Sequence, residues 1–375
     1  MRFTHCDLRI STTTVGIMVL LALCAGSASA QQFQTAVPYS THAATPSAVA
    51  AGDFNNDGRI DLVVQCDRVL DIFFALQNGA FGKRVQTPTT GFEDSIAVAD
   101  FDHDGNADVV TSNHYQSGTI SVLLGKGDGT FRSDTQYPTN SRYTEVVAVA
   151  DLNGDGVTDI VAGNYNKHGT ASVFLGNGDG TFQSVVNYPV GGAARGLDIA
   201  DFNGDGVPDL AVTVETTARI LLGVGDGTFL PHVDYPARFV ATDVKAADMN
   251  NDGKVDLVVA SWKSQVISVL LCNGDGTFAP KKDTPGSALA LAVADFNGDG
   301  LLDVLTAQCT GNCQPGNAEL LLGKGNGTFQ PPTFYPAGDN PDAVFATDFS
   351  RDGFPDVAVA DYSSGTVNVL LNTGK

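Results

Sequence analysis

A nine-residue pattern rich in aspartate occurs seven times in this chain, and its spacing constrains the fold more than any other feature. The copies begin at residues 53, 100, 151, 201, 248, 295 and 348. Their starts lie 47 to 53 residues apart, which is the period of a structural unit repeated in an array or a ring. The sequence therefore predicts seven copies of one unit, each with the pattern in the same place.

The pattern has the ligand chemistry of a calcium-binding loop. Positions 1, 5 and 9 are Asp in every copy, position 3 is Asn, Asp or Ser, and position 6 is Gly. Calcium takes about six to eight oxygen ligands, which such a loop can supply. We expect glycine at position 6 because a Cβ would obstruct the turn around the ion. The alternative is a set of Asp-Gly turns that join strands without metal.

Position 12 distinguishes this loop from an EF-hand, which needs a bidentate Glu there and flanking helices. Here position 12 is Val, Thr or Ala inside a short β-branched run, so we expect each loop to join two strands. Up to seven structural Ca²⁺ sites are predicted. The predicted ligands are Asp53, Asn55, Asp57, Asp61, Asp100, Asp102, Asp104, Asp108, Asp151, Asn153, Asp155, Asp159, Asp201, Asn203, Asp205, Asp209, Asp248, Asn250, Asp252, Asp256, Asp295, Asn297, Asp299, Asp303, Asp348, Ser350, Asp352 and Asp356.

Each unit has the pattern of four strands. An alanine-rich apolar strand precedes the loop, as at 146–150, and a second apolar strand follows it, as at 159–162. A third strand ends in a Gly-Asp-Gly-Thr-Phe turn, and a fourth runs to Tyr-Pro. Four strands in about 49 residues, without a helical period, are typical of a propeller blade. We therefore predict an all-β fold, a seven-bladed β-propeller with four-stranded antiparallel blades.

The two ends of the repeat region predict how the ring closes. The last repeat stops after its third strand at 366–371, and residues 33–39 resemble the fourth-strand segment at 182–188. We expect the N-terminal strand to complete the last blade, which also removes an exposed sheet edge.

The alternation of these turns with Asp-x-Asn-x-Asp-Gly-x-x-Asp loops resembles the FG-GAP or VCBS repeats of integrin α-subunit propellers and of many exported bacterial proteins. The resemblance covers residues 33–375. It implies a seven-bladed propeller with calcium in the loop between the first two strands of each blade. The first repeat departs from it, with Asn78-Gly-Ala-Phe81 in place of Gly-Asp-Gly-Thr-Phe. No transmembrane stalk follows the repeats, so the signalling role of integrins is not carried over.

The N-terminal region has the features of a secretory signal. Arg2 and Arg9 precede an apolar stretch at 15–25, and Ala28-Ser-Ala30 forms a small-residue cleavage site. We therefore predict a signal peptide at 1–30 and the propeller at 31–375. No later apolar stretch is long enough to span a membrane. A secreted, periplasmic or extracellular monomer is expected.

The negative net charge comes largely from the repeats. The formal charge is −21, and 22 of the 42 acidic residues lie in the seven patterns. Nucleic acid is a poor partner for such a surface. An exported protein can form disulfides, and we expect one between Cys309 and Cys313, with Cys66 and Cys272 as buried thiols.

Candidate ligand-binding residues lie in the segments that vary between repeats. Antiparallel strands place the loops between second and third strands on one face, together with the connections between blades. Aromatic, Lys and Arg side chains there can stack on sugars or anchor a protein partner. The candidates are His114, Tyr115, Arg142, Tyr143, Tyr165, His168, Arg195, Arg238, Trp262, Lys263 and Tyr362.

Three functional hypotheses fit these features. The preferred one is a secreted binding or adhesion module for a glycan or an extracellular protein. The second is an enzyme similar in fold to polysaccharide lyases or sugar dehydratases, for which His114, His168 and Arg142 are the available acid–base and charge-stabilising groups. No nucleophile motif, zinc spacing or phosphate loop accompanies them, so an enzyme is the less favoured hypothesis. The third is a calcium-stiffened structural component of the envelope or matrix.

Overall fold

The structure is a computed structural model that describes residues 32–374, except 43–44, 92, 115–117, 287–288 and 309–315. The predicted signal peptide, Tyr115, Cys309 and Cys313 lie outside the described residues. Residues 32–375 form one compact unit. Helical structure in the described part of the chain is confined to the short 3₁₀ helix η1 (Gln77–Gly79), and no helix there is long and apolar enough to cross a membrane.

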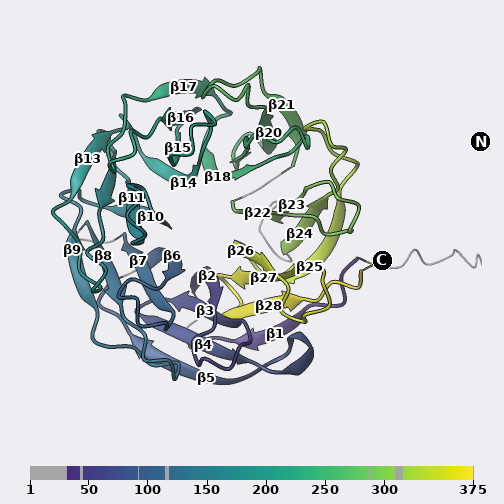
Figure 1. Cartoon of the computed structure of the whole chain (residues 1–375). Helices are drawn as coiled ribbons and strands as arrows, with labels where there is room; N and C mark the ends of the chain where they lie inside the picture. Colours follow the sequence, from purple (N-terminus) through teal and green to yellow (C-terminus); the bar gives the residue numbers. More distant parts are fainter. Residues whose placement is uncertain are drawn as a thin grey trace, which may run out of the picture. The chain divides into compact units, whose positions relative to one another are not determined.

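Seven four-stranded antiparallel sheets form the blades of a β-propeller, as the sequence predicts (Figure 1). The innermost strands are β2 (Pro46–Gly52), β6 (Glu93–Ala99), β10 (Thr144–Ala150), β14 (Ala194–Ala200), β18 (Ala241–Ala247), β22 (Leu291–Ala294) and β26 (Pro341–Thr347). We number the blades 1 to 7 in this order. The second strands are β3 (Asp61–Cys66), β7 (Asp108–Asn113), β11 (Asp159–Asn164), β15 (Asp209–Val214), β19 (Asp256–Ser261), β23 (Asp303–Gln308) and β27 (Asp356–Asp361).

The outer half of each blade consists of its third and fourth strands. The third strands are β4 (Val69–Ala75), β8 (Thr119–Leu123), β12 (Thr170–Phe174), β16 (Thr217–Leu221), β20 (Val266–Leu270), β24 (Gly316–Leu321) and β28 (Thr366–Leu370). The fourth strands are β5 (Phe81–Pro88), β9 (Thr135–Pro138), β13 (Val186–Pro189), β17 (Val233–Pro236), β21 (Lys282–Pro285), β25 (Thr333–Gly338) and, in blade 7, β1 (Val37–Ser40).

Blade 7 closes the ring as expected. Strand β1 pairs with β28, with Val37 opposite Val369 and Ser40 opposite Thr366. Phe33 forms a further bridge with Asn372. The N-terminal segment therefore supplies the fourth strand of the last blade.

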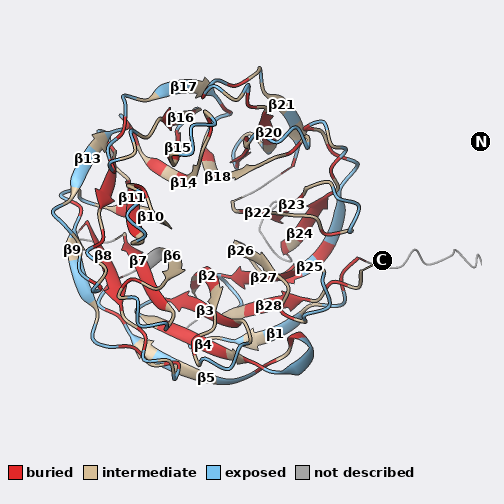
Figure 2. Cartoon of the chain, viewed as in Figure 1, coloured by how far each residue is buried: buried red, intermediate tan, exposed pale blue. Residues whose placement is uncertain are grey.

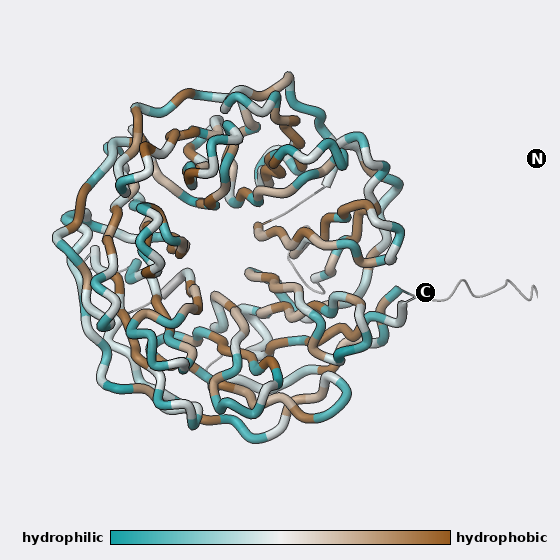
Figure 3. Tube along the Cα trace, viewed as in Figure 1, coloured by the Kyte–Doolittle hydropathy of each residue, from teal (hydrophilic) through white to brown (hydrophobic). Residues whose placement is uncertain are grey.

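The hydrophobic core lies between neighbouring blades. Seven buried clusters occur among the described residues, one at each junction between two blades. Second strands such as β3 and β11 (Figure 2) and β19 are buried along their whole length, because both of their faces pack against another blade. This explains their near-continuous apolar sequence. Figure 3 shows hydrophobic residues recurring along the strands inside the ring.

Aromatic residues of the two repeated motifs meet at these junctions. Phe54, at position 2 of the first Asp pattern, packs edge-on against Phe131 of the next blade, with ring centroids 5.9 Å apart. Phe101 and Phe182 repeat the contact at 5.6 Å, as do Phe202 and Phe278. Edge-to-face geometry at this distance is favourable. The two motifs therefore interlock successive blades.

A central channel with a volume of about 780 Å³ runs between the innermost strands, with alanine and valine as its commonest lining residues. Antiparallel pairing places the Asp patterns and the turns between third and fourth strands on one face of the ring, the loop face. The loops between second and third strands, and the links between blades, lie on the opposite face, the connection face.

Candidate calcium loops and candidate ligand site

The seven Asp patterns adopt one loop conformation. In each, Oδ2 of the first Asp accepts a hydrogen bond from the backbone N–H of the position-6 glycine at 2.7–2.9 Å. These glycines have φ between 78° and 92°, where other residues are strained. A Cβ added there would meet no atom within 4 Å. Glycine is therefore required for its backbone angle, which a Cβ disfavours through contacts with its own backbone and not with neighbouring residues.

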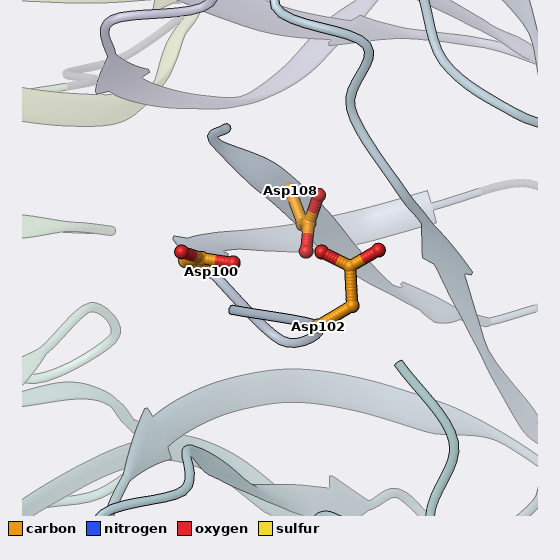
Figure 4. A group of neighbouring side chains, drawn as sticks. All are labelled: Asp100, Asp102 and Asp108. Carbon is orange, nitrogen blue, oxygen red and sulfur yellow. The ribbon is translucent and has the colours of Figure 1, made fainter. Parts of the chain in front are cut away.

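The second loop shows how the side-chain oxygens converge. Carboxylate oxygens of Asp100, Asp102 and Asp108 all lie within 4.8 Å of one another, and Figure 4 shows the three groups facing one another. Oδ1 of Asp100 is buried and has no hydrogen-bond partner. An unpaired buried carboxylate oxygen beside two others fits a hard divalent cation. The other loops carry Asn or Ser where this one has Asp102.

Basic side chains lie against two of these loops. Arg132 Nη1 lies 3.0 Å from Asp102 Oδ2, and Arg132 Nη2 lies 3.3 Å from Asp104 Oδ2. Arg59 pairs in the same way with Asp57 in the first loop. These exposed guanidinium groups offset part of the carboxylate repulsion, and a bound cation would compete with them.

The Asp at position 9 has a second role that sequence reasoning missed. Asp61 is fully buried, and its two oxygens accept hydrogen bonds from the backbone N–H of Phe54 at 3.1 Å and of Ala75 at 2.7 Å. The other six copies bond in the same way to the start of their own loop and to the residues after their third strand. This Asp therefore ties the loop to the outer half of the blade.

Burial also changes the acidity of these carboxyl groups. Loss of solvent raises the pKa of Asp61 and Asp108 to about 6, and neighbouring loop aspartates add to the rise. The hydrogen bonds from the backbone oppose it. Repulsion between loop carboxylates is thus present in the metal-free chain, and a cation at the loop would relieve it.

The loop of one blade also contacts the turn of the next. The backbone N–H of Gly180 donates to the carbonyl oxygen of Phe101 at 3.1 Å, and Gly276 donates to Phe202 at 3.0 Å. Asn56 Nδ2 donates to Asn106 Oδ1 at 2.6 Å, which joins the first loop directly to the second. Hydrogen bonds on the loop face therefore link neighbouring blades.

On the connection face, four of the predicted ligand residues come together from blades 2, 3 and 4. His114 stacks on Tyr143 with ring centroids 5.5 Å apart, and Arg195 Cζ lies 4.7 Å from the centroid of the Tyr165 ring. Arg195 Nη2 donates to the Tyr165 hydroxyl at 3.1 Å. His114 and Tyr165 are 5.9 Å apart between ring centroids. We call this group, with Glu145, the mouth cluster.

Glu145 holds the mouth cluster together, and it was not among the predicted residues. Its Oε2 lies 3.0 Å from His114 Nδ1, and its Oε1 lies 3.4 Å from Arg195 Nη1. Both Glu145 and Arg195 also line the central channel. The available signal was that Glu145 is one of only four glutamates in the chain and that every residue after it in β10 is apolar.

The remaining candidates lie elsewhere on the connection face. Arg142 Cζ sits 5.1 Å from the Tyr143 ring centroid, at the margin of the mouth cluster. The exposed His168 donates from its backbone N–H to Asn166. Tyr362 is 43% exposed. His168 is thus exposed in the loop between β11 and β12, and none of the contacts that define the mouth cluster includes it.

Two more candidates lie beside residues that sequence reasoning did not single out. Arg238 Nε donates to Asp283 Oδ2 at 2.9 Å. The backbone N–H of Trp262 donates to the carbonyl oxygen of Val240 at 3.1 Å. These contacts belong to blades 4 and 5.

The inner strands of blades 4 and 5 carry partly buried charges that the alanine-rich pattern did not predict. Asp198 Oδ2 accepts from the backbone N–H of Ala246 at 2.7 Å, and Asp243 Oδ2 accepts from Leu291 at 2.8 Å. Burial lowers the pKa of Lys245, but the adjacent Asp243 and Asp198 outweigh this and raise it. The two aspartates thus satisfy backbone groups on the inner edge of the next blade.

Comparisons with known proteins agree with the repeat pattern. The FG-GAP-like repeat model matches residues 53–111, 100–162, 151–212, 201–259, 248–306 and 295–359. Integrin alpha pat-2 of Caenorhabditis briggsae is 26% identical over 211 residues, 44% of this chain and 17% of that protein. The chain therefore spans about a sixth of the length of that relative.

Solved structures share the fold at low sequence identity. An Agrocybe aegerita lectin that recognises non-reducing terminal N-acetylglucosamine aligns with a TM-score of 0.57 and 20% identity, covering 85% of this chain and 86% of that one. BBS1N in complex with ARL6DN aligns with a TM-score of 0.63 and 11% identity, covering 91% and 97%. Because the repeat matches extend over most of the described blades, the chain belongs to the FG-GAP-like repeat family.

Proposed function

We propose that this protein is an exported binding module that recognises a glycan at the mouth cluster and is stabilised by calcium in its Asp loops. The observation that carries the proposal is the convergence of His114, Tyr143, Tyr165 and Arg195 from three blades around Glu145. A propeller fold, FG-GAP-like repeats and a structural neighbour that is a lectin together suggest a binding module.

The chemistry of the mouth cluster suits a sugar. Tyr143 and Tyr165 offer flat rings on which a sugar ring can stack, and their hydroxyl groups both donate and accept hydrogen bonds. Glu145 supplies a carboxylate acceptor, and Arg195 supplies fixed donors. A site that combines flat apolar surface with a few oriented polar groups beside a concavity is typical of small-ligand binding.

The Asp loops support the proposal as stabilising elements. Each loop carries carboxylate and carbonyl oxygens, and the buried Asp100 Oδ1 is left without a protein partner. Residues of all seven loops fit calcium by donor type. Bound calcium would neutralise repelling carboxylates on the face that links the blades, while the connection face stays free for ligand.

A glycan array probed with the purified chain in calcium tests this proposal. We expect binding to a defined set of glycans that is lost in Tyr165→Ala and in Glu145→Gln. The matched control is Phe334→Ala, which removes an exposed aromatic ring of blade 6 outside the cluster and should leave binding unchanged. Clean binding to a protein partner without any glycan would overturn the glycan assignment. Turnover of an acidic polysaccharide that is lost in His114→Ala would instead make the protein an enzyme.

A further inference from the structure

A second cluster on the connection face exposes two aromatic rings that neighbouring loops hold together. Phe239 is 59% exposed and Trp262 is 38% exposed. Besides the bond from Trp262 to Val240, the Ser264 hydroxyl donates to the carbonyl oxygen of Phe239 at 3.2 Å. The link between blades 4 and 5 is therefore fixed to the loop after β19. We call Phe239, Trp262, Lys263 and Arg238 the aromatic patch.

The backbone beside Phe239 is strained. Val240 has a φ of 58°, a region that β-branched residues rarely occupy. The corresponding residue before β26 is Asn340, with a φ of 57° and the same hydrogen bond, from the N–H of Tyr362 to its carbonyl oxygen at 3.0 Å. Asparagine tolerates this conformation well. Valine at this position costs stability, and it lies next to the more exposed of the two rings.

The aromatic patch is locally positive on an acidic protein. Lys263 Nζ lies 5.8 Å from the centroid of the Phe239 ring. Arg238 and Lys281 share one carboxylate, Asp283, so this trio keeps an excess positive charge. The chain as a whole has a formal charge of −21. A ligand of opposite charge would therefore be attracted here and repelled by most of the remaining surface.

We propose that the aromatic patch binds an extended acidic segment of a partner protein that carries an apolar side chain. The apolar side chain would cover Phe239 and Trp262, and acidic side chains would pair with Lys263 and with the Arg238–Lys281 pair. Exposed aromatic residues and Arg are enriched at the centres of protein interfaces. The charged groups of the aromatic patch, Lys263 and Arg238, are donors, as is the neighbouring Lys281, and donors match carboxylates. The mouth cluster, by contrast, contains the acceptor Glu145.

Trp262 is the only tryptophan in the chain, so its fluorescence reports directly on the patch. The probe is a synthetic twelve-residue peptide that repeats Glu-Asp-Phe-Glu, added to the full chain in calcium. Comparison peptides replace every acidic residue with Lys, or every Phe with Ser, and a polygalacturonate oligomer tests an anionic sugar. We expect only the acidic, Phe-containing peptide to shift Trp262 emission to shorter wavelength, with weaker binding at high salt.

Variants distinguish specific binding at the aromatic patch from non-specific binding. We expect Phe239→Ala and Lys263→Glu each to raise the Kd at least tenfold. Phe334→Ala removes an aromatic ring that is 49% exposed in blade 6 and should change nothing. Melting temperatures verify that each variant is folded. Equal binding of the Lys peptide, unchanged binding in Phe239→Ala, or a response to polygalacturonate alone would each overturn the proposal. Glycan binding at the mouth cluster is measured separately and is unaffected by these outcomes.

Discussion

The backbone nitrogen of Gly129 donates to the carbonyl oxygen of Phe54 at 2.8 Å. Gly129 belongs to the turn between the third and fourth strands of blade 2, and Phe54 is the second residue of the Asp loop of blade 1. Whatever orders the Asp loop therefore also orders a contact between blades.

Calcium removal should destabilise the whole ring. If free calcium is tenfold above the dissociation constant, each site adds about 1.4 kcal/mol. We expect a chelator to lower the melting temperature substantially, and excess calcium to restore it. Magnesium should restore less, because it prefers a smaller octahedral shell and releases water reluctantly. An unchanged melting curve after verified metal removal would contradict a structural role for calcium.

Substitutions at two aspartates of the third loop should differ in how far the loss of stability depends on calcium. Asp159 is buried and accepts hydrogen bonds from Leu152 and Gly176 at 2.9 and 2.8 Å, so Asp159→Ala leaves two buried N–H groups unpaired. We expect a loss of about 3 kcal/mol that persists in chelator. The exposed Asp155 is the matched control. Its carboxylate accepts from the backbone N–H of Val157 at 2.8 Å, so Asp155→Ala should lose little stability in chelator and clearly more when calcium is present. Denaturant unfolding with and without calcium distinguishes them.

Gly129 should tolerate substitution less well than a glycine that points into solvent. A Cβ at Gly129 would lie 2.1 Å from Phe74 Cζ, and its φ is 80°. Gly154 has a similar φ of 74°, but a Cβ there meets nothing within 4 Å. We expect Gly154→Ala to cost about 1 kcal/mol from backbone strain alone. Gly129→Ala should cost clearly more, and equal unfolding free energies would show that the contact between blades is unimportant.

Stability should fall with rising pH because of Asp361 on the connection face. Burial raises the pKa of Asp361 to about 8, and the Asp339 carboxylate adds to the rise. The folded chain then keeps a proton that the unfolded chain releases above about pH 4. Since the folded state binds more protons between these values, its stability decreases as pH rises through this window.

Asp361→Asn removes this titration. We expect the variant to match the parent chain near pH 4 and to melt at a higher temperature than the parent at pH 9. Asp339→Asn removes only the neighbouring charge and should weaken the slope in part. Parallel melting profiles of the parent and Asp361→Asn across this range would show that Asp361 is not the group responsible.

The sequence was sufficient for the blade count and for ring closure, because both are set by spacing within the chain. The period of the Asp pattern gives seven units, and the likeness of 33–39 to 182–188 identifies β1 as the missing strand. Cys66 and Cys272 are both buried, as expected. In blade 1, where Asn78-Gly-Ala replaces the usual turn, the chain forms η1 with Asn78 at a φ of 62°.

The candidate sites were less predictable, because they depend on which loops the ring brings together. Contact between His114 and Glu145 needs the angle between two blades, which no local pattern encodes. The second role of Asp61 depends on Ala75, fourteen residues away, and a ligand motif does not reveal it. Asp198 and Asp243 lie among small apolar residues in the inner strands, where their backbone partners belong to the next blade.

The pairing of β1 with β28 also determines how the ring responds to mechanical force. Phe33 and Val37 lie opposite Asn372 and Val369, so the outward-leading ends of both strands are at the same end of the pair. Tension between these ends loads the hydrogen bonds one after another, as in a zipper, and does not shear them together. We expect single-molecule pulling to detach β1 in a low-force step before any other blade opens, and a first event of full-blade size would contradict this.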